Sequence, residues 1–208
     1  MYIPHFNAMG EPDDIRDLVE AVGSAELVTV GTDGTPVSTL LPILWSPGGG
    51  TVVAHMARAN DHWRLIGDGA RCLAIISGPQ AYVSPSWYAA KAEHGRVVPT
   101  WNYSAVHLTG TVRVHDDPEW VRDAVTRLTD RHERRREQPW AVTDAPETYI
   151  DKSLKAIVGL ELTVERVEAK AKLSQNRSAA DRAGVVAGLR TEGGDPGVAD
   201  AMDAWPQT

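Results

Sequence analysis

The chain has 208 residues, 42% of them hydrophobic, with 28 acidic against 21 basic side chains and a formal net charge of −7. This size supports one good-sized hydrophobic core. The acidic balance repels polyanions, so it argues against direct binding to nucleic acid or to an anionic membrane. No apolar run approaches the length of a membrane span, and the first residues lack a signal-peptide pattern. With Cys72 as its single cysteine, too few for a disulfide, the chain is expected in the reducing cytoplasm.

The first half of the chain predicts one helix followed by short strands. Residues 13–22 carry an apolar stripe of helical spacing, and Gly23 ends the helix. The predicted strands lie at residues 27–30, 37–45, 51–57, 72–76 and 81–83. Asn60 or Asp61 caps a short helix between the third and fourth of them. The connections are short, which favours antiparallel pairing.

The second half opens with an irregular segment, residues 84–99, of a length typical of functional or mobile loops. Further strands are predicted at 106–114 and 158–164, and helices at 117–128, 146–154 and 183–189. Ser178 and Asp181 form a capping box before the last helix. From residue 191 the glycines and carboxylates predict a flexible acidic tail.

Together these elements predict a mainly β protein with peripheral helices, of the α+β class. The strands are numerous, short and closely spaced, which favours a closed antiparallel barrel. We expect a single domain over residues 1–190, including a C-terminal helix, followed by the tail at 191–208.

Two polar stretches, residues 98–103 and 172–177, hold more amide, hydroxyl and aromatic groups than a fold needs. Each adjoins a predicted strand, so we expect these side chains at strand ends, where a rigid sheet aims them at a ligand. The alternative is two well-satisfied turns. Turns usually require one glycine, asparagine or proline rather than six specific side chains in a row, which favours a site.

The segment 53–63 runs from a strand into a helix start, a junction that can bind anions. Arg58 offers a bidentate donor with Asn60 beside it, and a capped helix with a solvated arginine is the equal alternative. Three histidines are candidates for acid–base or haem chemistry. His55 is expected as a buried, hydrogen-bonded core residue and His107 on a sheet surface. His62, beside Trp63, is expected to project into a flat pocket.

Other chemistries lack support in the sequence. The single cysteine and the scattered histidines do not have zinc-ligand spacing. No serine lies in a nucleophile elbow, which argues against acyl transfer. The arginine-rich run 131–137 is interrupted by glutamates, so a solvated helix face is favoured over a DNA-binding surface.

Several motifs in one order resemble the PaiB family over nearly the whole chain. They are MYIP at 1–4, HMARAN at 55–60, YVSPSWY at 82–88, VPTWNY at 98–103, IVG at 157–159 and KLSQNR at 172–177. The resemblance implies an FMN-binding split barrel, usually a homodimer with the cofactor at the subunit interface. The family is labelled as negative transcriptional regulators.

The resemblance also implies a set of cofactor-binding residues. Ser38 and Thr39 would lie along the flavin ring system, and Arg58 and Asn60 at its phosphate. Lys172, Ser174, Gln175 and Asn176 would form a wall that faces the partner subunit, and Trp101 could stack on the ring. His55 and Trp63, from the same junction as Arg58, complete the expected cofactor-binding set.

A second branch that is similar to this family consists of haem-dependent piperazate synthases, which form a nitrogen–nitrogen bond in N5-hydroxyornithine. This chain departs from the usual family pattern at Ala171, where a tryptophan is usual, and at Asp61, where a proline is usual. Loss of the large ring would leave space for a wider cofactor or a substrate. An aspartate in place of proline frees the backbone before His62.

These observations lead to one main hypothesis and two alternatives. The main hypothesis is a haem b enzyme that cyclises an N-hydroxylated amino acid, with His62 as axial iron ligand. His62, Lys172 and Tyr88 would be its catalytic residues, moving protons. Arg58 and Lys172 would pair with carboxylates of haem or substrate. The alternatives are an FMN-binding regulator and an FMN oxidoreductase.

Overall fold

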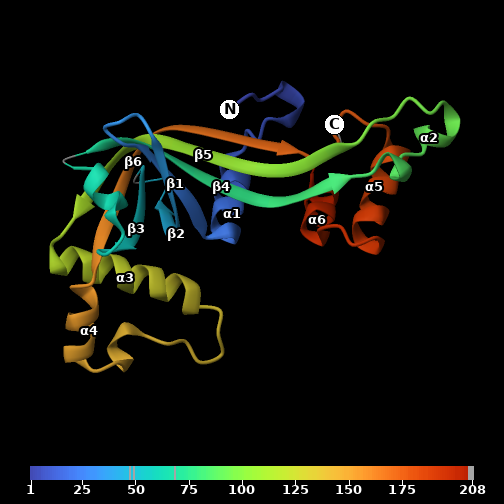
Figure 1. Cartoon of the computed structure of the whole chain (residues 1–208). Helices are drawn as coiled ribbons and strands as arrows, with labels where there is room; N and C mark the ends of the chain where they lie inside the picture. The colour runs from blue at the N-terminus through green and yellow to red at the C-terminus, as the bar shows by residue number, and fades with distance from the viewer. Residues whose placement is uncertain (47, 49, 68, 206–208) are drawn as a thin grey trace. The chain divides into compact units, whose positions relative to one another are not determined.

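The computed structural model describes residues 1–46, 48, 50–67 and 69–205 (Figure 1). The chain divides into two compact units. The barrel unit comprises Val19–Ile76 and His107–Val167, and the terminal unit comprises Met1–Leu18, Ser77–Val106 and Glu168–Thr208. No helix among the described residues is long and apolar enough to cross a membrane.

Six antiparallel strands form a closed barrel in the order β1-β2-β3-β6-β5-β4. Their bounds are β1 Ser24–Val30, β2 Pro36–Ser46, β3 Thr51–Ala57, β4 Ala70–Val83, β5 Thr100–His115 and β6 Ile157–Lys172. Pairing of β1 with β4, in which Leu27 lies opposite Ala74, completes the ring of strands. The predicted antiparallel barrel is therefore confirmed.

The barrel strands follow the predicted alternation of buried and accessible side chains. In β5, Val106, Leu108 and Val112 have no exposed surface. In β1, every second residue is buried, and the last of these is Thr29, a polar side chain in an apolar row. Cys72 on β4 is buried as a free thiol, as expected of a small hydrophobic residue.

Two helices complete the barrel unit, α3 (Pro118–Glu133) and α4 (Glu147–Leu154). Asp117 caps α3 by accepting a hydrogen bond from the Trp120 amide, and Pro118 occupies its first turn, as predicted. The helix contacts β3 and β2. A short 3-10 helix, η3 (Asp61–Leu65), follows β3, and Asn60 rather than Asp61 is its cap.

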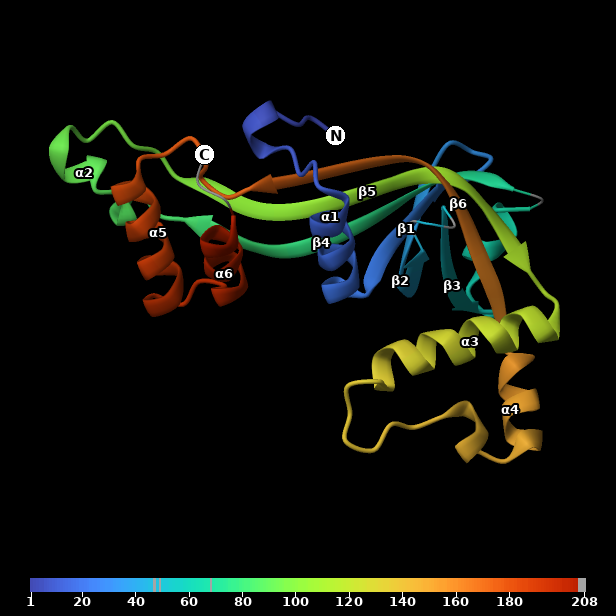
Figure 2. The same ribbon diagram turned by 180° about the vertical axis from the view of Figure 1, so that it is seen from behind.

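The terminal unit contains the far ends of β4, β5 and β6 with the helices α2 (Ala90–Glu93), α5 (Ala179–Thr191) and α6 (Pro196–Ala204). Helices α5 and α6 lie side by side (Figures 1 and 2). Ser178 caps α5 by accepting from the Asp181 amide, as predicted, whereas the Asp181 carboxylate accepts from the Ala90 amide. Helix α1 (Pro12–Val22) agrees closely with its predicted range.

Three segments differ from the sequence predictions. The strands predicted at 72–76 and 81–83 are one continuous strand, β4. The segment predicted as irregular holds the short helices η4 (Pro85–Trp87) and α2. Residues 196–204, within the predicted flexible tail, form α6 with Val198, Ala199 and Met202 buried.

Candidate functional site

The two polar stretches of the sequence meet in the terminal unit. The first of them leads into β5, which starts at Thr100, and the second begins where β6 ends, at Lys172; the two strands are neighbours. The Lys172 amine donates hydrogen bonds to the Thr100 hydroxyl and to the Trp101 carbonyl oxygen, the latter at 2.6 Å. The expected position at strand ends is confirmed, and hydrogen bonds join the two stretches.

A second contact joins the two stretches through buried groups. Asn102, with no exposed surface, donates from Nδ2 to the Ser174 hydroxyl at 3.0 Å. Ser174 has a backbone φ of 61°, a left-handed conformation that is uncommon outside glycine. Such backbone conformations persist where surrounding contacts hold them, as Asn102 does here.

Gln175 closes the end of β6 with its own side chain. Its Oε1 accepts from the Leu173 amide at 2.7 Å, and its Nε2 donates to the Ala171 carbonyl oxygen. Both polar groups of the side-chain amide therefore form hydrogen bonds with the local backbone. Asn176 is exposed beside it. The predicted ligand-binding wall thus divides into a structural Gln175 and an accessible Asn176.

The electrostatic setting of Lys172 is unusual for a lysine. Its side chain is half-buried. Burial, and then the nearby positive charges of Lys170 and Arg177, lower the pKa of its amine. The contacts of the amine are with neutral oxygens, so the ammonium form lacks a compensating carboxylate in these contacts.

Tyr88 lies in the hydrophobic core of the terminal unit, with 3% of its surface exposed. Its hydroxyl is buried and has no hydrogen-bond partner among the described residues, and the Arg177 guanidinium lies 4.6 Å from its ring centroid. Ala171 belongs to the same cluster and has no exposed surface. The Ala171 side chain is therefore enclosed by the buried cluster of the terminal unit.

His62, in the barrel unit, is held from both sides of its ring. Nε2 lies 2.8 Å from the Thr29 hydroxyl and Nδ1 lies 2.8 Å from the Thr39 hydroxyl. Asn60 extends this network, since its Nδ2 donates to the Thr39 hydroxyl at 3.3 Å and its Oδ1 accepts from the His62 amide at 3.0 Å. Burial lowers the pKa of His62, so the imidazole is neutral at pH 7.

Both ring nitrogens of His62 are therefore engaged, and the side chain is 3% exposed. Iron takes a nitrogen lone pair, so axial ligation by His62 requires one threonine hydroxyl to be displaced. The indole N–H of Trp63 also has a partner within the protein, since it donates to the Arg58 carbonyl oxygen at 2.9 Å. The expected projection of His62 into an open flat pocket is not present in this arrangement.

His55 is half-buried on β3, opposite Gly159 of β6. Its Nδ1 is buried without a hydrogen-bond partner among the described residues, and burial lowers the pKa of the ring. The expectation of a hydrogen-bonded core histidine is wrong for this nitrogen. His107, the third candidate, is half-buried on β5.

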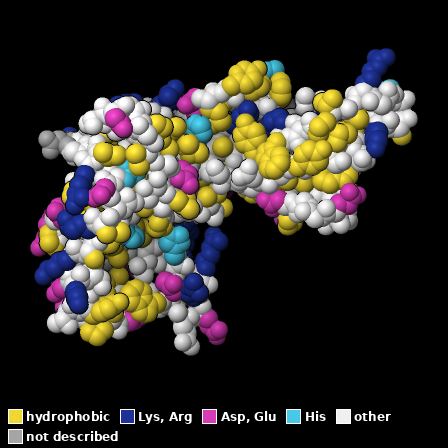
Figure 3. Space-filling view, viewed as in Figure 1, with side chains coloured by type: hydrophobic (Ala, Val, Ile, Leu, Met, Phe, Trp, Pro, Cys, Tyr) yellow, Lys and Arg dark blue, Asp and Glu magenta, His cyan; other side chains and the backbone are white. Residues whose placement is uncertain are grey.

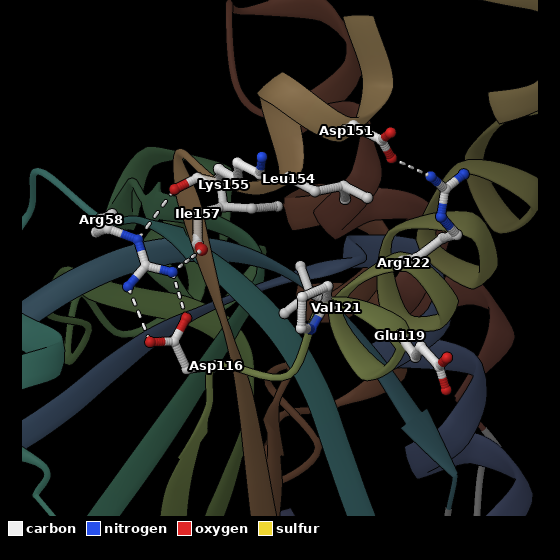
Figure 4. A pocket seen from close by; sticks show the side chains of 10 residues that line it. Arg58, Asp116, Glu119, Val121, Arg122, Asp151, Leu154, Lys155 and Ile157 are labelled. Atoms are coloured by element: carbon white, nitrogen blue, oxygen red, sulfur yellow. Dashed lines mark hydrogen bonds and ion pairs between the residues drawn. The ribbon is translucent and has the colours of Figure 1, made fainter. Parts of the chain in front are cut away.

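The Arg58 guanidinium is paired within the protein, and 35% of its side chain is exposed (Figure 4). Its guanidinium forms an ion pair with Asp116 and donates to the carbonyl oxygens of Lys155 and Ile157, at 3.0 and 3.1 Å. The hydrogen-bonded Asp116 carboxylate raises the pKa of Arg58. A phosphate at Arg58 would compete with this carboxylate. Ser38, on β2, is exposed, and its hydroxyl donates to Glu26.

The Arg58–Asp116 pair borders a cleft of about 500 Å³, within the range of ligand pockets. Arg122, on α3, lies in the same cleft and is paired with Asp151 at 2.7 Å (Figure 4). The apolar part of the lining is supplied by Pro118, Val121, Leu154 and Ile157. Both arginines of the cleft are paired with a carboxylate, so an anionic cofactor there would compete with Asp116 and Asp151.

A family model described as "Putative FMN-binding domain" matches residues 1–166. The chain belongs to this FMN-binding domain family. It is 31% identical over 194 residues to "Protease synthase and sporulation protein PAI 2" of Bacillus subtilis (strain 168), covering 92% of this chain and 90% of that protein. The predicted PaiB relationship is confirmed.

Solved structures share the fold of this FMN-binding family member. The FAD and haem binding protein from Mycobacterium smegmatis superposes with a TM-score of 0.59 at 20% identity, covering 80% of this chain and 73% of that one. The flavocytochrome Anf3 from Azotobacter vinelandii superposes with a TM-score of 0.53 at 14% identity, covering 80% and 70%. The predicted split-barrel fold is confirmed.

Sequence reasoning missed several contacts of this FMN-binding family member. Thr29 and Asp116 were not singled out, although a lone threonine in the apolar alternation of residues 25–29 is a usable signal. Asn102 lies inside a stretch that was singled out. Its pairing with Ser174 spans 72 positions of the chain, a separation that local patterns do not encode.

Proposed function

We propose that this chain is a flavin-binding enzyme that acts on a small molecule. The proposal is supported by membership of the FMN-binding domain family. The main supporting observation is that the two polar stretches meet at Lys172. The Lys172 amine has no carboxylate partner in these contacts, and one of them is with the backbone of Trp101. An FMN molecule has the matching parts, a phosphate and a flat ring system.

The residues of the terminal unit fit such a ligand. Lys172 contacts only neutral oxygens in its described hydrogen bonds, so a phosphate can replace them without separating an ion pair. Trp101 is 48% exposed, and its indole nitrogen donates to Gln80 at 3.2 Å, which fixes the orientation of the ring. Arg58 fits the phosphate less well, because Asp116 already holds it.

The barrel unit offers hydrogen-bonding groups of a different kind. Ser38 and Thr39 present hydroxyls on β2, and Thr39 is held by His62 and Asn60. A neutral imidazole donates from one ring nitrogen and accepts at the other, so it can relay a proton from one hydroxyl to the other. A bound flavin would supply hydride or electron transfer.

The deciding experiment is the visible absorption spectrum of the freshly purified protein, followed by release and identification of its chromophore. Flavin bands and FMN in the extract support the proposal. If the protein is colourless and does not bind added FMN at micromolar concentration, the proposal fails. A Trp101→Ala variant should weaken FMN binding about fivefold through lost stacking. Trp140→Ala serves as a control, because Trp140 is similarly exposed in the barrel unit.

The second candidate is the haem-dependent formation of a nitrogen–nitrogen bond in an N-hydroxylated ornithine, as in the piperazate synthases. It is favoured by the lowered pKa of His55, whose buried Nδ1 has no hydrogen-bond partner among the described residues, and by the lowered pKa of His62, where a lone pair becomes available only when a threonine hydroxyl is displaced. One protein of this fold is described as an FAD and haem binding protein, and another as a flavocytochrome. Haem would supply a Lewis-acidic iron that helps the hydroxyl group leave as water.

In that reaction the chain itself would handle protons. Lys172 has a lowered pKa and suits a base that takes a proton from the attacking amine. The buried Tyr88 hydroxyl has no hydrogen-bond partner among the described residues, so its proton is available for donation. A Soret band and conversion of N-hydroxyornithine to a cyclic product would support this candidate. If His62→Ala retains haem with an unchanged spectrum, His62 is not the ligand.

Two further properties belong to the proposal. We expect a homodimer, to be tested by light scattering of the eluted protein. The negative-regulator label of the family would require DNA binding, which the net charge of −7 disfavours. A gel shift with the pure protein on its own promoter, selective at moderate salt, would instead support the regulator.

A further inference from the structure

A pocket of about 640 Å³ opens in the terminal unit, between the N-terminal segment and the part of the chain that follows β6. We call it the terminal pocket, and its volume is within the range of small-molecule sites. The side chains that give it chemical character are Phe6, Glu11 and Asp14 from the N-terminal segment and the start of α1, Arg177 after β6, Arg182 on α5 and Trp205 after α6. None of these side chains is a flavin contact in the proposed function.

The two arginines of the terminal pocket have no carboxylate partner among the described residues. The Arg182 guanidinium donates to the carbonyl oxygens of Leu173 and Met202, at 3.2 and 2.9 Å. The Arg177 guanidinium lies over the ring of Tyr88, 4.6 Å from its centroid. Both arginines are half-buried. These contacts fix the positions of the guanidiniums but leave their charges without a counter-ion, whereas buried charges in proteins are normally paired.

Glu11 and Asp14 bring the opposite charge to the same pocket. They lie three residues apart at the start of α1, a spacing that puts side chains on one side of a helix. Both are exposed, and within the described part of the chain neither carboxylate forms an ion pair with an arginine or a lysine. The helix dipole stabilises carboxylates at this end of a helix, but it does not explain two arginines without counter-ions in the same pocket.

Two aromatic side chains supply an apolar surface in the terminal pocket. Phe6 is 41% exposed, and Trp205 is half-buried against the hydrophobic core of the terminal unit. The segment that carries Phe6 is anchored to β6, because the Met9 amide donates to the Ala169 carbonyl oxygen at 3.2 Å. Figure 3 shows hydrophobic and cationic side chains together on the face that carries the N-terminal segment. The pocket therefore combines positive charge, negative charge and exposed aromatic surface.

We infer that the terminal pocket binds a zwitterionic amino acid with an apolar or aromatic side chain. The carboxylate of the ligand pairs with the two arginines, its ammonium group pairs with Glu11 and Asp14, and its side chain contacts Phe6 and Trp205. A ligand with a single charge is disfavoured, because the like charges of the pocket repel it and the opposite set stays unpaired. This binding goes beyond the proposed function and does not depend on it.

The test is calorimetric titration of the full chain with L-phenylalanine, with 3-phenylpropionate, which lacks the ammonium group, and with phenethylamine, which lacks the carboxylate. L-Phenylalanine should bind at least about tenfold more tightly than either analogue, as expected for the loss of one charge-assisted contact. Arg177→Gln should reduce its advantage over phenethylamine, and Asp14→Asn its advantage over 3-phenylpropionate. The matched controls are Arg96→Gln and Asp17→Asn, at exposed positions of the same unit outside the pocket.

Three results would overturn amino-acid binding at the terminal pocket, whether or not the protein binds a flavin. The first is that 3-phenylpropionate binds as tightly as L-phenylalanine, which would make the pocket an anion site. The second is that none of the three compounds binds at millimolar concentration. The third is that the control variants weaken binding as much as the pocket variants do. Circular dichroism of each variant checks folding, and the exposed Glu11 gives an independent variant, Glu11→Gln, if Arg177→Gln does not fold.

Discussion

At the scale of single residues, the histidine network of the barrel unit gives the sharpest test. Thr29 is 1% exposed and its hydroxyl lies 2.8 Å from Nε2 of His62. A Thr29→Val substitution keeps the shape but leaves a buried ring nitrogen without a partner, so we expect a loss of about 1 to 3 kcal/mol in the free energy of unfolding. Urea unfolding measures it.

The control for that variant is Thr163→Val, at an exposed position on β6. It makes the same chemical change without a buried partner, so its effect should remain within about 0.5 kcal/mol. Equal effects of the two substitutions would show that the Thr29 hydroxyl does not hold His62.

A second residue-scale prediction concerns pH. Burial lowers the pKa of His55 and His62 from the ordinary value of 6.5. Below pH 6.5 the unfolded chain therefore binds more protons than the folded one, and stability falls as pH falls. The loss stops growing once the pH lies below the lowered folded-state pKa. We expect a lower free energy of unfolding at pH 5.5 than at pH 7.5.

His55→Gln should reduce this pH dependence, because one of the two neutral buried rings is removed. The exposed His5→Gln is the matched control in the terminal unit. Denaturant unfolding at the two pH values gives the comparison. An unchanged pH dependence in His55→Gln would mean that burial of this ring does not affect its ionisation.

At the scale of elements, α5 depends on two glycines that face Trp87. A Cβ at Gly188 would lie 2.3 Å from the indole, and one at Gly184 would lie 2.0 Å from the Trp87 carbonyl oxygen. Gly188→Ala should therefore destabilise the protein by about 1 to 3 kcal/mol, although alanine favours helices. Thermal unfolding tests this against Gly10→Ala, where no atom lies within 4 Å of the new Cβ.

Most elements followed from the sequence, whereas the continuity of β4 and the existence of the helices η4, α2 and α6 did not. Gly78 and Pro79 suggested a break between strands, yet β4 runs through them. A Cβ at Gly78 would meet Leu18 at 2.8 Å, so this glycine serves a close packing contact rather than a turn. In the tail, Asp195 and Pro196 form a regular helix start that the acidic composition obscured.

The candidate site was predictable in place but not in detail. The two polar stretches were expected at strand ends and lie there, because alternation and turn chemistry are local. The partners of His62 and Arg58 were not expected. Thr29 lies 33 positions from His62, and Asp116 lies 58 positions from Arg58, so only the closed barrel brings them together.

At the scale of the whole molecule, cofactor binding should raise stability by mass action. A ligand that binds only the folded chain adds about 2.7 kcal/mol at a free concentration one hundred times its Kd. We expect FMN at that concentration to raise the Tm measurably, and a smaller rise with riboflavin at the same concentration. An FMN-independent Tm would contradict binding to the folded state.

The buried thiol of Cys72 on β4 is a natural probe of how often the barrel opens. Burial raises the pKa of Cys72 to about 12, so almost no thiolate exists at pH 8, and the thiol has 3% exposure. An alkylating reagent can react appreciably only with molecules in which this strand has separated from its neighbours. Because Cys72 is the sole thiol of the chain, the labelling rate reports how often the barrel comes apart, with no probe introduced.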